Sequence, residues 1–182
     1  MGTQVSSGRR VAIKSLPLAS VEELSSFVEC KAGLQQVRVP AEVFYHFLAA
    51  WLCWRGVVTP LDWAVDDTYA YLVMTCPGVD VKKFTLRGCR GKLPDYMVKN
   101  ITRQMLNIAV ALDKVGIEHR DLKLDNFIIN PHTKRVQIID FGIAVTKQTA
   151  SRSVFTDMIG TPEYMPPEAF EREKWTAERG NV

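Results

Sequence analysis

Two polar segments on either side of a short apolar stretch constrain this sequence more than any other feature. Positions 119–126 read HRDLKLDN, and positions 140–142 read DFG. Between them, the apolar runs 127–129 and 136–139 flank Asn130-Pro131-His132, a pattern that predicts two short antiparallel strands joined by a turn. Such a hairpin reverses the chain, so it brings the two polar segments beside one another.

The polar residues of these segments are the types that phosphoryl transfer needs. That reaction requires a carboxylate to accept the proton of the attacking hydroxyl, oxygen ligands for Mg²⁺, and a cation near the transferred phosphate. Asp121 can serve as the base, Lys123 as the cation, and Asn126 with Asp140 as the metal ligands. The alternative is a charged surface loop, which would not require this spacing. The sequence therefore indicates a phosphoryl-transfer site.

Two segments have the apolar periodicity of amphipathic helices. The longer runs from Pro94 to about position 115 and ends at Gly116, and the shorter begins at Pro40. In both, apolar residues recur at steps of three and four. The stripe of the longer helix comprises Met97, Ile101, Met105, Ile108, Leu112 and Val115, and that of the shorter comprises Val43, Phe44, Phe47, Leu48 and Trp51.

Strands are predicted mainly in the first half of the chain. Residues 10–14 alternate so that Ala12 and Lys14 share a face, and the apolar run 69–74 ends at Cys76-Pro77-Gly78. Strands therefore dominate early and helix dominates late. This order predicts an α+β fold with two unequal parts.

Composition narrows the class of protein. The 182 residues are 47% hydrophobic and 24% charged, which excludes a disordered or low-complexity chain. No apolar run approaches the roughly 18 residues that cross a bilayer, although Met1-Gly2 with Ser6 fits a short myristoylation pattern. A net charge of +3, with no basic cluster interleaved with aromatic residues, argues against nucleic-acid binding. The four cysteines form no C-x-x-C pair, so we expect reduced thiols in the cytoplasm or the nucleus.

With these motifs in place, the sequence resembles a eukaryotic protein kinase over nearly its whole length. Val11-Ala12-Ile13-Lys14 is similar to the strand whose lysine binds nucleotide phosphates and pairs with a glutamate of the next helix. Glu42, on the shorter predicted helix, matches that glutamate, and Glu29 is the alternative. The resemblance implies a bilobal kinase-like fold with ATP and Mg²⁺ as cofactors.

The resemblance also implies which residues hold Mg-ATP. Asn126 and Asp140 match the metal ligands, and Lys14 matches the phosphate-binding lysine. Met74 is the residue expected to guard the back of the adenine pocket. The full set implied for the nucleotide is Ala12, Lys14, Met74, Cys76, Ile128, Asn126 and Asp140.

Within the kinases, the closest resemblance is to the Pim family of serine/threonine kinases. It rests on PPE at positions 166–168, where most kinases have A-P-E, and on the segments 38–43, 61–63 and 154–157. The connector proline of Pim kinases matches Pro77, which has no N–H to offer adenine.

Two features of the resemblance concern the protein substrate. Lys123 implies a serine or threonine acceptor, and Thr161 matches a threonine that supports the pair of base and lysine. Lys82 and Thr85 stand where Pim-like kinases carry acidic residues that meet basic substrates. Two interpretations of Asp125 therefore stay open: a contact for a basic substrate side chain, or a solvated loop residue.

The resemblance divides the chain at the connector. Residues 1–76 match a small N-terminal lobe, and residues 77–182 match the connector and the large lobe through the activation segment. No G-x-G-x-x-G precedes Lys14, and the chain stops where a kinase continues into a buried helix, so we expect a partial kinase domain. The implied function is ATP-dependent phosphorylation of protein serine and threonine hydroxyls, without nucleic acid or membrane. A catalytically inactive kinase-like fragment or binding module is the alternative.

Overall fold

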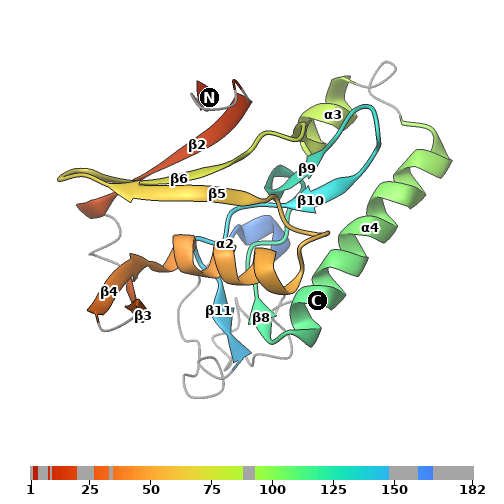
Figure 1. Cartoon of the computed structure of the whole chain (residues 1–182). Helices are drawn as coiled ribbons and strands as arrows, with labels where there is room; N and C mark the ends of the chain where they lie inside the picture. Colours follow the sequence, from red (N-terminus) through yellow and green to blue (C-terminus); the bar gives the residue numbers. More distant parts are fainter. Residues whose placement is uncertain are drawn as a thin grey trace.

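The computed structural model describes residues 2–3, 8, 10–19, 27–32, 35–87, 93–147 and 160–165. These residues form an α+β fold, in which a strand-rich N-terminal part lies beside a part that contains the longest helix (Figure 1). The predicted fold class is confirmed. The segments 154–157 and 166–168, which partly carry the Pim resemblance, lie outside the described residues.

An antiparallel sheet forms the N-terminal part, and the two strands predicted at 10–14 and 69–74 are its central pair. Their register places Ala12 opposite Met74 and Lys14 opposite Leu72. The sheet has the spatial order β1-β2-β6-β5. Its strands are β1 (Gly2–Thr3), β2 (Arg10–Pro17), β6 (Tyr69–Thr75) and β5 (Pro60–Val65).

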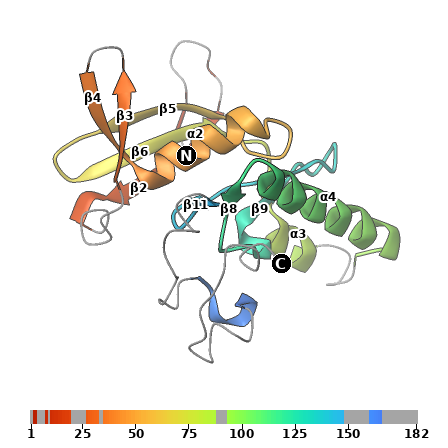
Figure 2. The same cartoon turned by 90° about the horizontal axis from the view of Figure 1, so that it is seen from below.

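The shorter predicted helix is confirmed as α2 (Ala41–Leu52), which begins one residue after the predicted start at Pro40. It follows a hairpin of β3 (Phe27–Ala32) and β4 (Gln35–Pro40), which Figures 1 and 2 both show at the N-terminal end of the helix. The predicted apolar stripe is only partly right, because Trp51 is 77% exposed. The helix packs against two separate apolar clusters, so its buried arc is wider than one stripe. The arc comprises Glu42, Val43, Tyr45, His46 and Ala49.

Helix α4 (Asp95–Lys114) is the longest helix of the described chain and follows the short α3 (Val81–Arg87). Its predicted stripe is confirmed. Gly116 follows the helix with a φ of 77°, the left-handed conformation that glycine adopts without strain. The stripe residues Ile101, Ile108 and Leu112 are buried, and Met97, Met105 and Val115 pack against the same core.

The predicted hairpin follows α4 and lies between the two parts of the molecule. Its strands, β9 (Phe127–Ile129) and β10 (Val136–Ile138), pair with Ile129 opposite Val136. Strand β7 (Val79–Asp80) adds to β9 directly after the connector. A side chain at Gly78 would lie 2.0 Å from the Ile129 carbonyl oxygen, so only glycine permits this approach.

Several short elements complete the fold around the hairpin. A strand pair joins β8 (Ile117–Glu118) to β11 (Val145–Thr146), and 3₁₀ turns cover Leu124–Asn126 and Pro162–Tyr164. One apolar core lies among α4, the hairpin and α2, and a smaller one lies between α2 and the N-terminal sheet. Among the described residues, no helix is both long and apolar enough to cross a bilayer.

Candidate active site

Lys14, Glu42 and Asp140 form an ionic network that joins three elements. The Lys14 Nζ on β2 lies 2.5 Å from Glu42 Oε1 in the first turn of α2. The same ammonium group lies 2.8 Å from Asp140 Oδ1, which follows β10. The structure thus places Glu42 beside Lys14, whereas Glu29 lies in β3 opposite Arg38.

In this network the charges of Lys14 and Asp140 stabilise each other, whereas burial raises the pKa of Glu42 in spite of Lys14. Burial alone would lower the pKa of Lys14, but the neighbouring Glu42 and Asp140 outweigh it and raise that pKa. Burial would likewise raise the pKa of Asp140, but Lys14 and the Gly142 N–H outweigh it and lower that pKa. Lys14 and Asp140 are therefore both charged at neutral pH.

Asp140 adopts a backbone conformation that residues other than glycine rarely adopt. Its φ is 69°, in the left-handed region where a residue other than glycine is strained. Gly142 allows the chain to turn closely around this site, since a side chain there would begin 3.3 Å from Glu42 Oε2 and 3.4 Å from Asp140 Oδ1. The strained backbone and the glycine together aim the Asp140 carboxylate at Lys14.

The second cluster surrounds the Asp121 carboxylate. Thr161 Oγ1 donates to Asp121 Oδ1 at 2.6 Å, and the Asn126 amide nitrogen donates to Oδ2 at 2.9 Å. Lys123 Nζ lies 2.7 Å from Oδ2 and also donates to Thr161 Oγ1 at 2.7 Å. Three predicted residues, Lys123, Asn126 and Thr161, therefore converge on the carboxylate of Asp121.

These contacts decide the charge of Asp121. Partial burial would raise the pKa of its carboxyl group, but hydrogen bonds from Lys123, Thr161 and Asn126 outweigh burial and lower it. Asp121 is therefore ionised at neutral pH and acts as a hydrogen-bond acceptor. A hydroxyl group that approaches it meets a carboxylate that is already oriented.

The β9–β10 hairpin connects the two clusters through the backbone. The Ile139 N–H donates to the Asn126 carbonyl at 2.9 Å, and the His119 ring nitrogen Nε2 lies 3.0 Å from the Ile139 carbonyl oxygen. Phe141 is fully buried between the rings of His119 and His46, with centroid distances of 4.9 and 5.2 Å. The segment that carries Asp140 is thus held beside the segment that carries Asp121.

The residues predicted around adenine also lie together. Ala12 faces Met74 in the register of β2 and β6, and both Ala12 and Ile128 pack against the buried cluster that contains Met74. Cys76 follows β6 and is half-buried. Among the described residues, Cys30, Cys53 and Cys76 are free thiols.

Comparison with known proteins identifies the family. A model of the protein kinase domain matches residues 1–179 of this chain. The chain belongs to the protein kinase domain family. A kinase domain implies the use of ATP and Mg²⁺, which agrees with the cofactors predicted from the sequence.

Several curated relatives of this kinase domain are plant calcium-dependent protein kinases. Calcium-dependent protein kinase 6 of Oryza sativa subsp. japonica is 29% identical and covers 96% of this chain, which spans 31% of that protein. Calcium-dependent protein kinase 20 of the same organism is 30% identical over 93% of the chain and 29% of its own length. Calcium-dependent protein kinase 5 of Arabidopsis thaliana is 28% identical over 96% of this chain, which spans 30% of that protein. The chain therefore spans about three tenths of these relatives, and since they are not Pim kinases, the Pim resemblance stays a prediction.

The polar groups of this kinase domain fit Mg²⁺ bound together with phosphate oxygens. The Asp140 side chain is 39% exposed, so its carboxylate is accessible. Asn126 uses its amide nitrogen to bind Asp121, which leaves the amide oxygen without a hydrogen bond to any described residue. No group of three His, Cys, Asp or Glu side chains suited to a metal lies in the described part of the chain. One carboxylate and one amide oxygen, completed by phosphates, are a common arrangement for Mg²⁺.

The sequence prediction missed two features beside this site. Lys82 Nζ lies 3.1 and 3.2 Å from the two carboxylate oxygens of Asp125, so Asp125 is ion-paired instead of simply solvated. Asp80 lies opposite Ile128 in the strand register. Its carboxylate binds both the backbone N–H and the ammonium group of Lys83. In the sequence, Asp80 follows closely after the connector Cys76-Pro77-Gly78, and this closeness was the available signal that it lies beside the site.

Proposed function

We propose that the protein containing this chain is an ATP-dependent serine/threonine protein kinase, and that this chain carries its phosphoryl-transfer residues. One observation supports this most strongly. The network of Lys14 and Asp140 and the cluster of Asp121 and Lys123 lie at the two sides of one hairpin, joined by the bond between Ile139 and Asn126. A nucleotide-binding group and a base are thereby held together.

The chain's own side chains have separate roles in this proposal. Asp121 accepts the proton of the attacking hydroxyl group, because it is ionised and held in place by three donors. Lys123 lies beside Asp121 and offers positive charge where the phosphoryl group is transferred. Thr161 orients both of them through its hydroxyl group.

Lys14, Asn126 and Asp140 would hold the nucleotide and its metal. Mg-ATP, when bound, supplies the phosphoryl group and the positive charge that neutralises it. Glu42 acts as a positioning residue, since it contacts Lys14 and fixes the direction of the ammonium group. Ala12, Met74, Cys76 and Ile128 would form the apolar surfaces around adenine.

The Pim-like character belongs to the same proposal and rests on the connector. Pro77 has no N–H, so the backbone there cannot donate a hydrogen bond to adenine. The ion pair between Lys82 and Asp125 supports the interpretation that the domain does not strongly prefer arginine-rich substrates. Protein substrates with serine or threonine acceptors remain the proposed class.

A phosphotransfer assay tests the proposal. The natural full-length protein is incubated with Mg²⁺ and γ-labelled ATP and a library of serine and threonine peptides, as wild type and as Asp121→Asn. We expect transfer by the wild type and a loss of about 10³-fold in the variant, since general-base catalysis contributes about 10²–10⁴-fold.

The matched control is Asp67→Asn, which makes the same chemical change on an exposed turn between β5 and β6. It should keep the wild-type rate. Equal transfer by the wild type and Asp121→Asn, or no transfer by a wild type that binds Mg-ATP, would contradict the proposal.

A further inference from the structure

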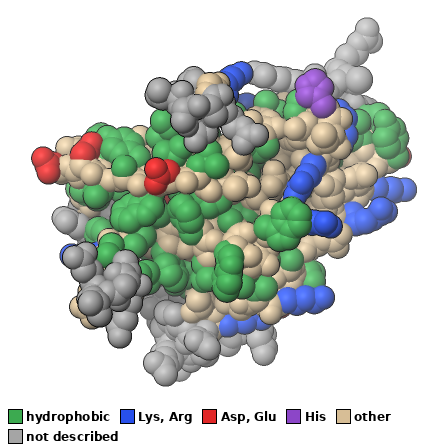
Figure 3. Space-filling view, viewed as in Figure 1, with side chains coloured by type: hydrophobic (Ala, Val, Ile, Leu, Met, Phe, Trp, Pro, Cys, Tyr) green, Lys and Arg blue, Asp and Glu red, His purple; other side chains and the backbone are tan. Residues whose placement is uncertain are grey.

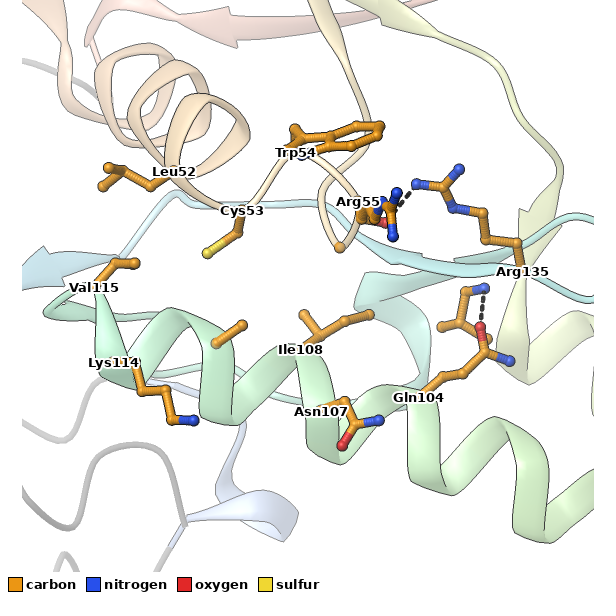
Figure 4. Close-up of a pocket in the computed structure, with 13 residues that line it drawn as sticks. Leu52, Cys53, Trp54, Arg55, Gln104, Asn107, Ile108, Lys114, Val115 and Arg135 are labelled. Carbon is orange, nitrogen blue, oxygen red and sulfur yellow. Dashed lines mark hydrogen bonds between the residues drawn. The ribbon is translucent and has the colours of Figure 1, made fainter.

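A pocket outside the proposed active site lies between the end of α2 and helix α4. Its volume is about 570 Å³, which falls in the range of small-molecule sites. Figure 4 shows Cys53 with its sulfur directed toward α4, and Ile108 on the helix facing it. The loop approaches the helix closely at Gly56, where a side chain would begin 3.0 Å from Ile108. None of the proposed nucleotide or catalytic residues lines this pocket.

The lining of the pocket is mainly apolar. Ile108 and Val136 are buried beneath it, and Trp54 is 63% exposed at its rim. The polar side chain of Gln104 is already occupied, because its oxygen accepts the Val136 N–H at 3.0 Å. An aliphatic or aromatic group could therefore enter without leaving this amide unpaired.

The charged side chains among the residues that line the pocket are all positive. They are Arg55, Lys114 and Arg135, and no carboxylate of the described chain lines it. None of these three cations forms an ion pair with a described residue. Asp113, the chain neighbour of Lys114, is paired with Lys147 at 2.8 Å. Figure 3 likewise shows Lys and Arg side chains gathered on the side of the molecule where α4 lies.

Two of the cations are held together at one end of the pocket. The Arg135 Nη2 donates to the Arg55 carbonyl at 2.8 Å, and the Arg55 guanidinium group lies 4.8 Å from the Trp54 ring centroid. Figure 4 places Arg55 and Arg135 side by side, with Lys114 at the opposite end. Two guanidinium groups at one end of a pocket suit a carboxylate or a similar planar anion.

From this arrangement we infer that the pocket binds a small amphipathic anion. The anionic head lies between Arg55 and Arg135, and the apolar chain extends along Ile108 toward Cys53. The charge pattern favours an anion over a neutral or cationic ligand of the same length. The inference is independent of the proposed kinase activity, because it involves other residues.

Alkylation of Cys53 provides a site-specific test. Burial raises the pKa of this thiol, so reaction with iodoacetamide is followed at mildly alkaline pH by peptide mass spectrometry. Cys76, outside the pocket, is the internal reference. We expect decanoate to slow alkylation of Cys53 about tenfold at saturation while Cys76 is unaffected, and decyltrimethylammonium to have no effect on either.

Variants locate the head group. Arg55→Glu should weaken protection by decanoate about tenfold or more, because it replaces one attractive charge with a repulsive one. Arg103→Glu makes the same charge change on an exposed part of α4 outside the pocket and should leave protection unchanged. Arg135→Gln keeps a donor for the Arg55 carbonyl and should also weaken protection, so the test does not depend on one variant folding.

Other occupants would give different results, and each would overturn the inference. Equal protection by decyltrimethylammonium would show an apolar surface without charge selection. Protection that rises with protein concentration alone would show an interface between two copies of the chain. Protection by an acidic apolar peptide but not by decanoate would show a docking surface for a protein partner. No step of this test uses phosphoryl transfer, so its failure is distinguishable from failure of the proposed function.

Discussion

The ionic network around Lys14 and the cluster around Asp121 are assembled over different distances along the chain. Lys14 is separated from Glu42 by 28 positions and from Asp140 by 126. Asp121 and Asn126 are only 5 positions apart, in one loop and its 3₁₀ turn. Most of the Asp121 cluster is therefore set by local chain geometry, whereas the Lys14 network depends on the packing of three elements.

This difference makes helix α2 the variable part of the site. Its Glu42 reaches Lys14 only while the helix stays packed, and the helix is anchored near the site by His46. The His46 ring contacts Phe141, and its Nε2 lies 2.7 Å from the Val58 carbonyl oxygen. Conditions that disturb His46 should act first on the Lys14 network and leave the Asp121 loop in place.

Of the changes considered, low pH should have the largest effect on the Lys14 network, and it should act through His46. Burial lowers the pKa of this fully buried ring to about 4, from an ordinary value of 6.5, so the folded state binds the proton less well than the unfolded state. The contribution of His46 to the free energy of unfolding is therefore fully present above about pH 6.5. It is lost as the pH falls to about 4 and below, and the loss amounts to about 3 kcal/mol.

Urea unfolding of the wild type and His46→Gln across this pH range measures the effect. Other groups titrate too, including the buried His119, so the difference between the two proteins isolates His46. Glutamine can still donate to Val58 but does not titrate. A difference in unfolding free energy that does not change with pH would contradict this role for His46.

Removal of the Asp140 charge should weaken the nucleotide side of the site alone. Asp140→Asn removes a partner of Lys14 and a proposed metal ligand, so we expect about 100-fold weaker binding of Mg-ATP, or about 2.7 kcal/mol. A thermal-shift titration should show stabilisation of the wild type by Mg-ATP and little of the variant.

Asp125→Asn is the matched control for this measurement. Asp125 carries the same charge in the adjoining loop, but its carboxylate is paired with Lys82. Its variant should bind Mg-ATP as the wild type does. Equal stabilisation of all three proteins would show that Asp140 does not hold the metal.

Loss of the Thr161 hydroxyl group should affect the other side of the site. Thr161→Val removes the donor to Asp121 Oδ1 and the acceptor for Lys123, while the direct contact of Lys123 with Asp121 remains. We expect kcat to fall about tenfold, with KM for ATP unchanged. The acidic limb of the pH–rate profile should move to higher pH, because one cause of the low pKa of Asp121 is lost.

Serine at this position separates positioning from simple destabilisation. Thr161→Ser retains the hydroxyl group and should recover most of the rate. If the serine and valine variants are equally slow, the hydroxyl group is not the important feature of Thr161.

The smallest expected effect is the coupling between the two sides. Glu42→Gln should weaken Mg-ATP binding about tenfold, because it removes the charge that holds Lys14. Glu42 and Thr161 share no direct contact, so the double variant should show the sum of the two losses within about 0.5 kcal/mol. A larger coupling energy, measured by a double-mutant cycle on kcat/KM, would show that the two clusters form one unit.

Secondary structure followed closely from the sequence where one periodicity dominates. Helix α4 has a single apolar stripe between Pro94 and Gly116, and the structure reproduces it. The stripe predicted for α2 failed at Trp51, because that helix packs against two cores at once and its buried arc depends on where they lie. A hydrophobic period shows that a helix has a buried face, but not how many neighbours cover it.

The predicted site residues also divide into those whose contacts are local in the chain and those whose contacts depend on the fold. Asp121, Lys123 and Asn126 could be assigned from spacing alone, because a loop and a hairpin bring together residues that are close in the chain. The choice between Glu42 and Glu29 required the fold, since both follow the Lys14 strand and only one lies on the helix facing it. The pairing of Lys82 with Asp125 was not predictable, because it joins the start of α3 to the 3₁₀ turn Leu124–Asn126.

The family motifs, the α4 stripe and the contacts of Asp121 with Lys123 and Asn126 follow from the sequence alone, since each depends on one segment or one repeating pattern of the chain. Tertiary structure decided the three-membered Lys14 network, the burial of His46 and the cationic pocket beside Cys53. Those features join separate elements: Lys14 lies 28 and 126 positions from its two partners, and Arg55 lies 80 positions from Arg135. Contacts of that kind form only when the packing of separate cores fixes how the elements meet, because no local preference of the chain specifies it.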